Sequence, residues 1–341
     1  MAYIGIDVHK TASQIAVLPE EPTDSDDVEP LEEIRVENAN LDEFAHQYEG
    51  SEAVLEATSN YYTIYETLDE YLDVRVANPL EMKWIGEAAQ KTDEIDAKKL
   101  AELLRVDMVA ESYVPPEEIR RYRQLTRGRQ KFVHERTKWK NEVNALLDQH
   151  GVRYDDDLFT KEGREFLAEL ALEEPGDLLL EQWLETIDDL SERIEKLDEE
   201  IEEIAAEREQ PQLLQTIPGV GAYSAVVIYA EIGEIERFDD ADKLVSYAGL
   251  DPTGRESGDS RTEGSISKEG NSQLREVLVR AAKVAVHTCN DPYLSTFYWR
   301  LRGEKNKPAL VARVATARKL LISIYHMLDR EEKYDPPGVS D

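Results

Sequence analysis

The chain opens with MAYIGIDVHKTASQIAVL (residues 1–18). Its apolar residues fall into two short runs, 3–8 and 13–18, separated by a short polar turn, which predicts a β-hairpin. Asp7 lies inside the first run. A carboxylate in an apolar strand is costly to bury unless it is paired or binds a metal. The rest of the sequence should therefore contain groups that explain Asp7.

The next 90 residues alternate between strand and helix patterns. Strands are predicted at 31–36, 52–57 and 74–78, and helices at 41–50, 60–72 and 91–106. Three strands followed by helix, strand, helix, strand and helix predict a ribonuclease-H-like α/β domain over residues 1–115.

Four acids of this region form the candidate catalytic and metal site: Asp7, Glu56, Asp93 and Asp96. In the predicted fold the first and fourth strands are neighbours and a later helix crosses their end, so the four carboxylates could meet at one rim. Their mutual repulsion would be relieved by a divalent cation, and hard carboxylate oxygens suit Mg²⁺ or Mn²⁺. An alternative stays open, because Asp93 and Asp96 could simply cap a helix and Glu56 could face water.

Composition limits the remaining classes. Lys and Arg number 40 and Asp and Glu 73, a formal net charge of −33, which resembles the surface of a halophilic protein. The single cysteine, Cys289, excludes a disulfide within the chain and suits the cytoplasm. The sequence predicts no membrane span and no signal peptide.

Two segments oppose this acidity. Residues 119–141 hold nine Lys or Arg and one acid, with aromatic residues between them, and 298–320 hold seven and one. Such segments favour phosphate binding, the alternative being a solvated helix face. The candidate nucleic-acid-binding residues of the first segment are Arg120, Arg121, Arg123, Arg127, Arg129, Lys131, Lys138 and Lys140.

The second half is predicted to be mostly helical. Apolar residues from Trp183 to Ile204 are spaced alternately four and three apart, a heptad seam that predicts a coiled coil within or between chains. IPGVG (217–221) resembles the turn of a helix-hairpin-helix motif, with Gly219 and Gly221 presenting backbone N–H groups to phosphate. Residues 251–272 are predicted to form a long polar loop.

The expected organisation is a catalytic domain at 1–115, a basic helical segment at 116–150, a helical linker with the coiled coil at 151–210, a mostly α C-terminal domain at 211–335 and a tail at 336–341.

Several stretches resemble the DEDD transposases of insertion-sequence family 110. YIGIDVHK, VLEATSNYY and KTDEIDAKKLAELLR are similar to its three acidic motifs, and IPGVG, YAGLDPTGRESG and ISKEGNSQLR to its C-terminal transposase domain. Ser59 stands where the family usually has glycine.

The resemblance implies specific roles. Asp7, Glu56, Asp93 and Asp96 would be the metal-binding acids of a domain similar to RuvC-type Holliday-junction resolvases, and Ser257 the nucleophile. Arg255, Lys268, Asn271 and Arg275 would contact nucleic acid. The implied function is a transposase or DNA recombinase with element-end and target DNA, a noncoding bridge RNA and a dimer or tetramer as partners.

Three alternatives remain open. The protein could be a metal-dependent RuvC-like nuclease without serine chemistry, a non-catalytic nucleic-acid-binding protein, or an actin-like kinase. The kinase is disfavoured because His9 stands where its phosphate loop usually has glycine, and no second phosphate loop is evident.

Overall fold

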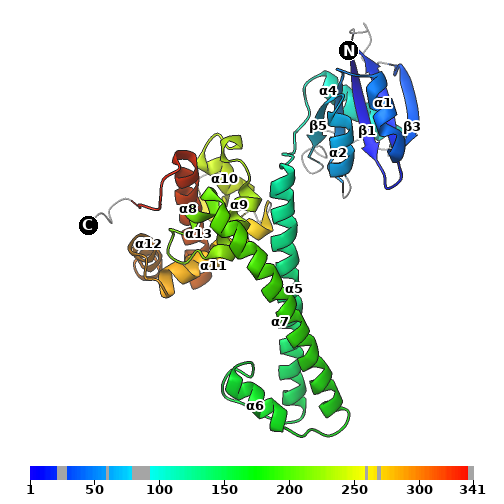
Figure 1. The fold of residues 1–341 in the computed structure, drawn as a ribbon. Coiled ribbons are helices and arrows are strands. Elements are labelled where there is room, and N and C mark those ends of the chain that lie inside the picture. The colour runs from blue at the N-terminus through cyan, green and yellow to red at the C-terminus, as the bar shows by residue number, and fades with distance from the viewer. Residues whose placement is uncertain (21–28, 59–60, 79–92, 258–259, 267–269, 337–341) are drawn as a thin grey trace. The chain divides into compact units, whose positions relative to one another are not determined.

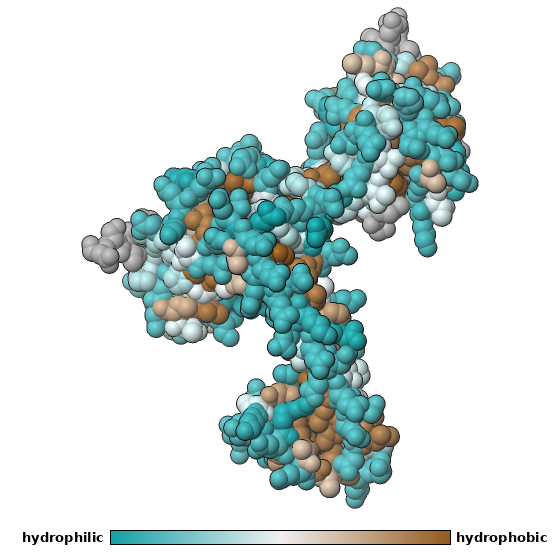
Figure 2. Space-filling view, viewed as in Figure 1, coloured by the Kyte–Doolittle hydropathy of each residue, from teal (hydrophilic) through white to brown (hydrophobic). Residues whose placement is uncertain are grey.

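The computed structural model describes residues 1–20, 29–58, 61–78, 93–257, 260–266 and 270–336, and within these not the side chains of 93–95, 252–257 and 260–266. The chain divides into two compact units, Met1–Pro115 and Pro116–Asp341. Figure 2 shows that hydrophilic residues cover most of the visible surface, as the net charge of −33 requires.

The first unit is built on a five-stranded mixed sheet (Figure 1). Its strands are β1 (Ala2–Val8), β2 (Ala12–Pro19), β3 (Glu32–Glu37), β4 (Glu52–Glu56) and β5 (Asp73–Ala77). They lie in the order β3-β2-β1-β4-β5. β2 pairs antiparallel with β1 and β3, whereas β1–β4 and β4–β5 are parallel. The predicted strands and the α/β class of this unit are confirmed.

Helices cover both faces of the sheet. They do so because the strands carry apolar side chains on both faces, which must be shielded from water. The helices are η1 (Asn38–Asn40), α1 (Leu41–Gln47), α2 (Tyr61–Asp69) and α4 (Asp93–Arg105). Ile4, Ile6 and Val8 pack with α1 and α2. Val54 belongs to a separate cluster with Leu100 of α4. The sheet is therefore a buried central layer.

The second unit is mainly helical. Its helices are α5 (Glu117–Gln149), α6 (Lys161–Glu169), α7 (Gly176–Glu207), α8 (Glu209–Leu214), α9 (Ala222–Ile232), η2 (Ile235–Arg237), α10 (Ala241–Tyr247), α11 (Ser272–His287), α12 (Pro292–Gly303) and α13 (Ala309–Arg330). The largest core cluster of this unit joins α8 to α13.

The heptad seam of α7 lies on a long pair of helices formed with α5 (Figure 1). Ile187, Leu190, Ile194 and Ile201 of the seam are buried. The pairing is antiparallel, because Arg129 of α5 meets Asp198 of α7 and Trp139 meets Trp183. In the described structure the seam thus packs against a helix of its own chain.

The prediction of a long polar loop over 251–272 is wrong. β6 (Pro252–Ser257) and β7 (Ser260–Ile266) form an antiparallel ribbon with Ser257 opposite Ser260. Polar residues occupy both alternate sets of positions, so the sequence lacks the apolar–polar alternation that signals a half-buried strand. The Gly258–Asp259 dipeptide between the strands is a hairpin signal that composition obscured.

Candidate functional site

Asp7 and Glu56 stand at the carboxyl ends of two adjacent parallel strands. The β1–β4 register pairs Tyr3 with Glu52 and Ile6 with Leu55, and its next step brings Asp7 level with Glu56. Residues level with each other on adjacent strands point to the same face. The Asp7 side chain is 16% exposed, and its Oδ2 lies 3.3 Å from Nε2 of His9. Two of the predicted acids therefore share one edge of the sheet.

The helix that carries the other two acids packs directly on β1. A Cβ added to Gly5 would lie 2.0 Å from the carbonyl oxygen of Ala97 and 2.5 Å from the nitrogen of Ala101. Gly5 shares its strand face with Asp7. Asp96, which is half-buried, immediately precedes this contact. Glycine at position 5 thus allows α4 to lie against the strand face that carries Asp7.

The donor set at this edge is acidic and hard. Among the side chains that the structure describes, no three His, Cys, Asp or Glu residues form a group that could hold a metal ion. The side chain of Asp93 lies outside the described residues, so this finding concerns Asp7, Glu56 and Asp96. Carboxylate oxygens fit Mg²⁺ or Mn²⁺ better than softer metals.

Ser257 is the last residue of β6. Its side chain, that of Arg255, and Lys268 lie outside the described residues. The base of the ribbon is described. The backbone nitrogen of Asn271 donates to the carbonyl oxygen of Tyr247 at 2.8 Å, and Nη1 of Arg275 donates to that of Ala248 at 2.8 Å. Asn271 and Arg275, which follow the β6–β7 ribbon in the sequence, are therefore hydrogen-bonded to the C-terminal end of α10.

The side chain of Asn271, predicted to contact nucleic acid, makes three hydrogen bonds to other described residues of the chain. Its Oδ1 accepts from the nitrogen of Leu274 and so caps α11. Its Nδ2 donates to Oε2 of Glu231 at 2.7 Å and to the Tyr247 hydroxyl at 3.1 Å. These contacts give Asn271 a structural role at the base of the ribbon.

Glu231 is a residue that the sequence reasoning missed. It is fully buried on α9. Burial alone would raise the pKa of its carboxyl, but hydrogen bonds from Arg127 and Asn271, with the charges of Arg127 and Arg123, outweigh burial and lower the pKa. The signal was present, because Glu231 is a lone acid in the apolar run AVVIYAEIG, as Asp7 is in the first strand.

Several arginines of the basic segment have hydrogen-bond partners inside the unit, among them Arg123, Arg127 and Arg129. Nε of Arg123 donates to the Ala230 carbonyl oxygen at 2.7 Å, Arg127 holds Glu231 with two hydrogen bonds, and Arg129 holds Asp198 with two. These residues join α5 to α9 and α7.

The other cations of the segment are distributed differently. Nζ of Lys140 lies 4.4 Å from the centre of the Phe159 ring, and burial lowers its pKa. Arg120 is half-buried, whereas Arg121, Lys131 and Lys138 are exposed. The exposed cations are the better candidates for phosphate contact.

The two glycines of the IPGVG turn have different surroundings. Gly219 has φ of +92°, and a Cβ there would lie 2.7 Å from the nitrogen of Ala285 on α11. Gly221 is the N-cap of α9, and a Cβ there would have no atom within 4 Å. Gly219 is thus required by packing, whereas Gly221 faces open space.

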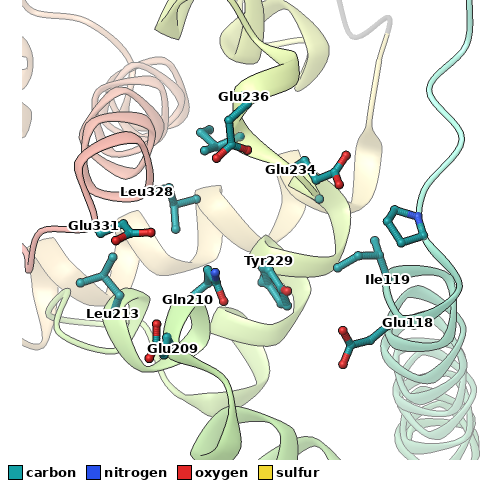
Figure 3. A pocket seen from close by; sticks show the side chains of 13 residues that line it. Glu118, Ile119, Glu209, Gln210, Leu213, Tyr229, Glu234, Glu236, Leu328 and Glu331 are labelled. Atoms are coloured by element: carbon teal, nitrogen blue, oxygen red, sulfur yellow. The ribbon is translucent and has the colours of Figure 1, made fainter.

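A cavity of about 430 Å³ lies among α5, α8, α9 and α13 (Figure 3). Its lining includes Glu118, Glu209, Glu234, Glu236 and Glu331. Five carboxylates make it unfavourable for a phosphate group.

None of the helices in the described ranges combines the length and apolarity that crossing a bilayer requires.

Comparison with known proteins identifies the family. A model named for the DEDD transposases of IS110, described as "Transposase", matches residues 4–152, and a model described as "Transposase IS116/IS110/IS902 family" matches residues 211–299. The two matches include both predicted catalytic regions.

Curated relatives agree with these matches. The chain is 26% identical to the "Probable family 20 transposase" of Pseudomonas aeruginosa, covering 72% of this chain and 74% of the relative. It is 28% identical to the "Transposase for insertion sequence element IS1111A" of Coxiella burnetii, covering 72% and 69%. It is also 28% identical to the "Pilin gene-inverting protein" of Moraxella bovis, covering 57% and 58%. The chain belongs to the IS110 family of transposases.

Proposed function

We propose that this protein is a DNA recombinase that cuts and rejoins the strands of an insertion sequence with Ser257 as nucleophile. The observation that carries the proposal is the location of Asp7 and Glu56 at the ends of adjacent parallel strands in a β3-β2-β1-β4-β5 sheet. This strand order, with its antiparallel and parallel pairings, supports a ribonuclease-H-like domain with a RuvC-like active site.

Asp7, Glu56, Asp93 and Asp96 would hold Mg²⁺ or Mn²⁺. Such ions stabilise negative charge on the oxygens of a phosphodiester. The role is supported by the level positions of Asp7 and Glu56 and by the packing of α4, which carries Asp93 and Asp96, on the same face at Gly5. The described side chains of Asp7, Glu56 and Asp96 do not by themselves form a group that could hold an ion. The surrounding protein excludes most solvent from Asp7, which strengthens its electrostatic interactions.

Ser257 would act through its hydroxyl. A bond forms between its Oγ and the phosphorus, and the bond between phosphorus and one bridging oxygen of the DNA strand breaks. The serine proton is transferred to a base, and the leaving oxygen takes up a proton to become the hydroxyl of the strand end. The phosphoserine ester conserves the energy of the broken bond, so a second strand end can reverse the step and rejoin. The contacts of Asn271 and Arg275 hold the chain that follows the β6–β7 ribbon, and so support the ribbon that carries Ser257.

The nucleic-acid partners follow from the family and from charge. We propose element-end and target DNA, a bridge RNA and a homo-oligomer, dimer or tetramer, that brings two duplexes together. Exposed cations of α5, Arg121, Lys131 and Lys138, and the open N-cap of α9 at Gly221 are candidate phosphate contacts. The acidic surface predicts folding and activity in concentrated salt.

A second function is metal-dependent cleavage without a serine intermediate. The acidic edge at Asp7 and Glu56 favours it independently, because two-metal sites can direct water at a phosphodiester. This nuclease would cut DNA but would not conserve bond energy for rejoining.

The test compares three variants on plasmids carrying the element with its flanking noncoding DNA. We expect Asp7→Asn and Ser257→Ala to abolish recombination, and the matched Asp73→Asn, at the exposed start of β5, to retain it. Denaturing gels should show a protein–DNA adduct that disappears in Ser257→Ala. Cutting by Ser257→Ala without an adduct would favour the hydrolytic nuclease, and full activity of Asp7→Asn would contradict the metal site.

A further inference from the structure

A groove with a volume of about 410 Å³ lies between α11 and α13. Four cations line it: Arg275, Arg280 and Lys283 from α11 and Arg313 from α13. The acid in its lining is Glu276. In a chain with 73 acids and 40 basic residues, a cavity lined by four cations and one acid departs strongly from the average surface.

The acid of the groove, Glu276, contacts side chains of α5. Oε2 of Glu276 accepts a hydrogen bond from Nε2 of Gln130 at 2.7 Å, and its Oε1 lies 3.9 Å from Nε2 of His134. Both partners belong to α5. Because Glu276 is held by α5, its charge offsets the groove cations less than an acid placed between them would.

Two of the cations, Arg313 and Lys283, retain capacity for a ligand. Nε of Arg313 is buried and has no hydrogen-bond partner among the described residues. Lys283 is exposed and makes no ion pair within the part of the chain that the structure describes. The guanidinium of Arg280 lies 5.4 Å from the centre of the Tyr223 ring and is hydrogen-bonded to the Tyr223 side chain, so a ligand would share this guanidinium with Tyr223. An unsatisfied buried guanidinium nitrogen costs free energy that an anion would recover.

Spacing on α11 places these groups together. Arg275, Val279 and Lys283 are four residues apart, so they follow one another along one helix face. Arg313 and the 64%-exposed Leu310 approach this face from the first turns of α13. The groove thus combines cations with apolar patches that suit the apolar faces of sugars.

We propose that the α11–α13 groove binds the phosphodiester backbone of a nucleic acid that the recombinase holds during strand exchange. The inference rests on the proposed function and adds a binding surface outside Ser257 and the four acids. Three of the four cations are arginines, whose planar donor fork matches two phosphate oxygens. Direct contact of this kind matters in concentrated salt, because the screening length is about 3 Å at 1 M.

Charge reversal on the exposed groove residue gives the test. Lys283→Glu is compared with Lys196→Glu on α7, which is equally a change of an exposed lysine. Arg313→Ala removes the guanidinium whose Nε has no hydrogen-bond partner among the described residues. A labelled 30-base-pair DNA duplex and an RNA duplex of the same sequence are titrated by fluorescence anisotropy from 0.1 to 1 M KCl, and thermal melting by circular dichroism checks the fold.

We expect both groove variants to weaken binding about tenfold or more and to lower the slope of log K against log salt by about 1 for each lost phosphate contact, with Lys196→Glu near wild type. Weakening confined to DNA identifies DNA as the ligand, and weakening confined to RNA identifies RNA. The proposal would be overturned if the groove variants bound the DNA duplex and the RNA duplex each as tightly as Lys196→Glu does.

This outcome is separable from that of the proposed function. Loss of recombination in Asp7→Asn with normal binding by Lys283→Glu would support the proposed recombinase and contradict nucleic-acid binding in the groove. Weak binding by Lys283→Glu together with an active Asp7→Asn would support binding in the groove and contradict the proposed metal site.

Discussion

Arg127 donates two hydrogen bonds to the carboxylate of Glu231, from Nε to Oε1 at 2.8 Å and from Nη2 to Oε2 at 2.7 Å. Glu231 also accepts from Asn271, the residue that caps α11 after the serine ribbon. One buried carboxylate therefore joins the basic helix α5, the apolar helix α9 and the base of the ribbon that carries Ser257.

Arg127→Ala is expected to destabilise the second unit by about 3 kcal/mol, because it leaves Glu231 buried with much of its charge uncompensated. The exposed pair Arg193–Asp189 on α7 provides the control. Arg193→Ala should leave the stability close to that of wild type, because solvent screens an exposed ion pair. Denaturant unfolding followed by circular dichroism measures both, and equal losses would show that the Glu231 network is no more important than a surface ion pair.

The same network predicts a pH dependence. The pKa of Glu231 is lower in the folded chain than the ordinary value of about 4.3 in an unfolded one. Folding is therefore stabilised by this group above the unfolded pKa, and the stabilisation is lost as the pH falls through the folded pKa. We expect wild type to exceed Glu231→Gln in free energy of unfolding at pH 6, with the difference shrinking below about pH 4. A difference independent of pH would rule out the ionised carboxylate as its source.

The sequence predicted the first unit well because its signals are local. Apolar alternation marks its strands, and the lone Asp7 marks their functional edge. The serine ribbon was missed because its residues are polar on both faces, so the period of two carried no hydropathy contrast. The turn signal at Gly258–Asp259 was available but was included in a stretch assigned to loop from composition alone.

Side-chain partners were the less predictable part of the candidate site. The run of arginines in α5 indicates positive charge, but only packing decides which arginines face inward. Arg123, Arg127 and Arg129 are attached to other helices, whereas Lys283 and Arg313 line a groove from segments far apart in the sequence. The lone Glu231 could have been found by the argument applied to Asp7.

Gly5→Ala tests the packing of α4 on β1. The added Cβ would meet the backbone of Ala97 at 2.0 Å and of Ala101 at 2.5 Å, so α4 must shift, carrying Asp96 with it. We expect a loss of about 3 kcal/mol and of recombination.

Gly128→Ala in α5 is the opposite case to Gly5→Ala. A Cβ at Gly128 has no atom within 4 Å, so alanine should stabilise the helix by about 0.5 to 1 kcal/mol. Thermal melting and recombination assays compare the two variants. A wild-type melting profile for Gly5→Ala would contradict the close contact between helix and strand.

Gly219→Ala and Gly221→Ala separate packing from phosphate binding in the IPGVG turn. Alanine at position 219 must adopt φ near +92° and would contact Ala285 of α11, so we expect about 2 kcal/mol of destabilisation. Alanine at 221 meets open space and replaces a glycine N-cap, which costs about 1 kcal/mol or less. Its methyl group would nevertheless project where a phosphate must approach the first N–H groups of α9. Gly221→Ala should therefore weaken duplex binding several-fold at nearly unchanged stability. Anisotropy titration alongside melting measures both, and unaltered affinity would restrict the turn to joining α8 and α9.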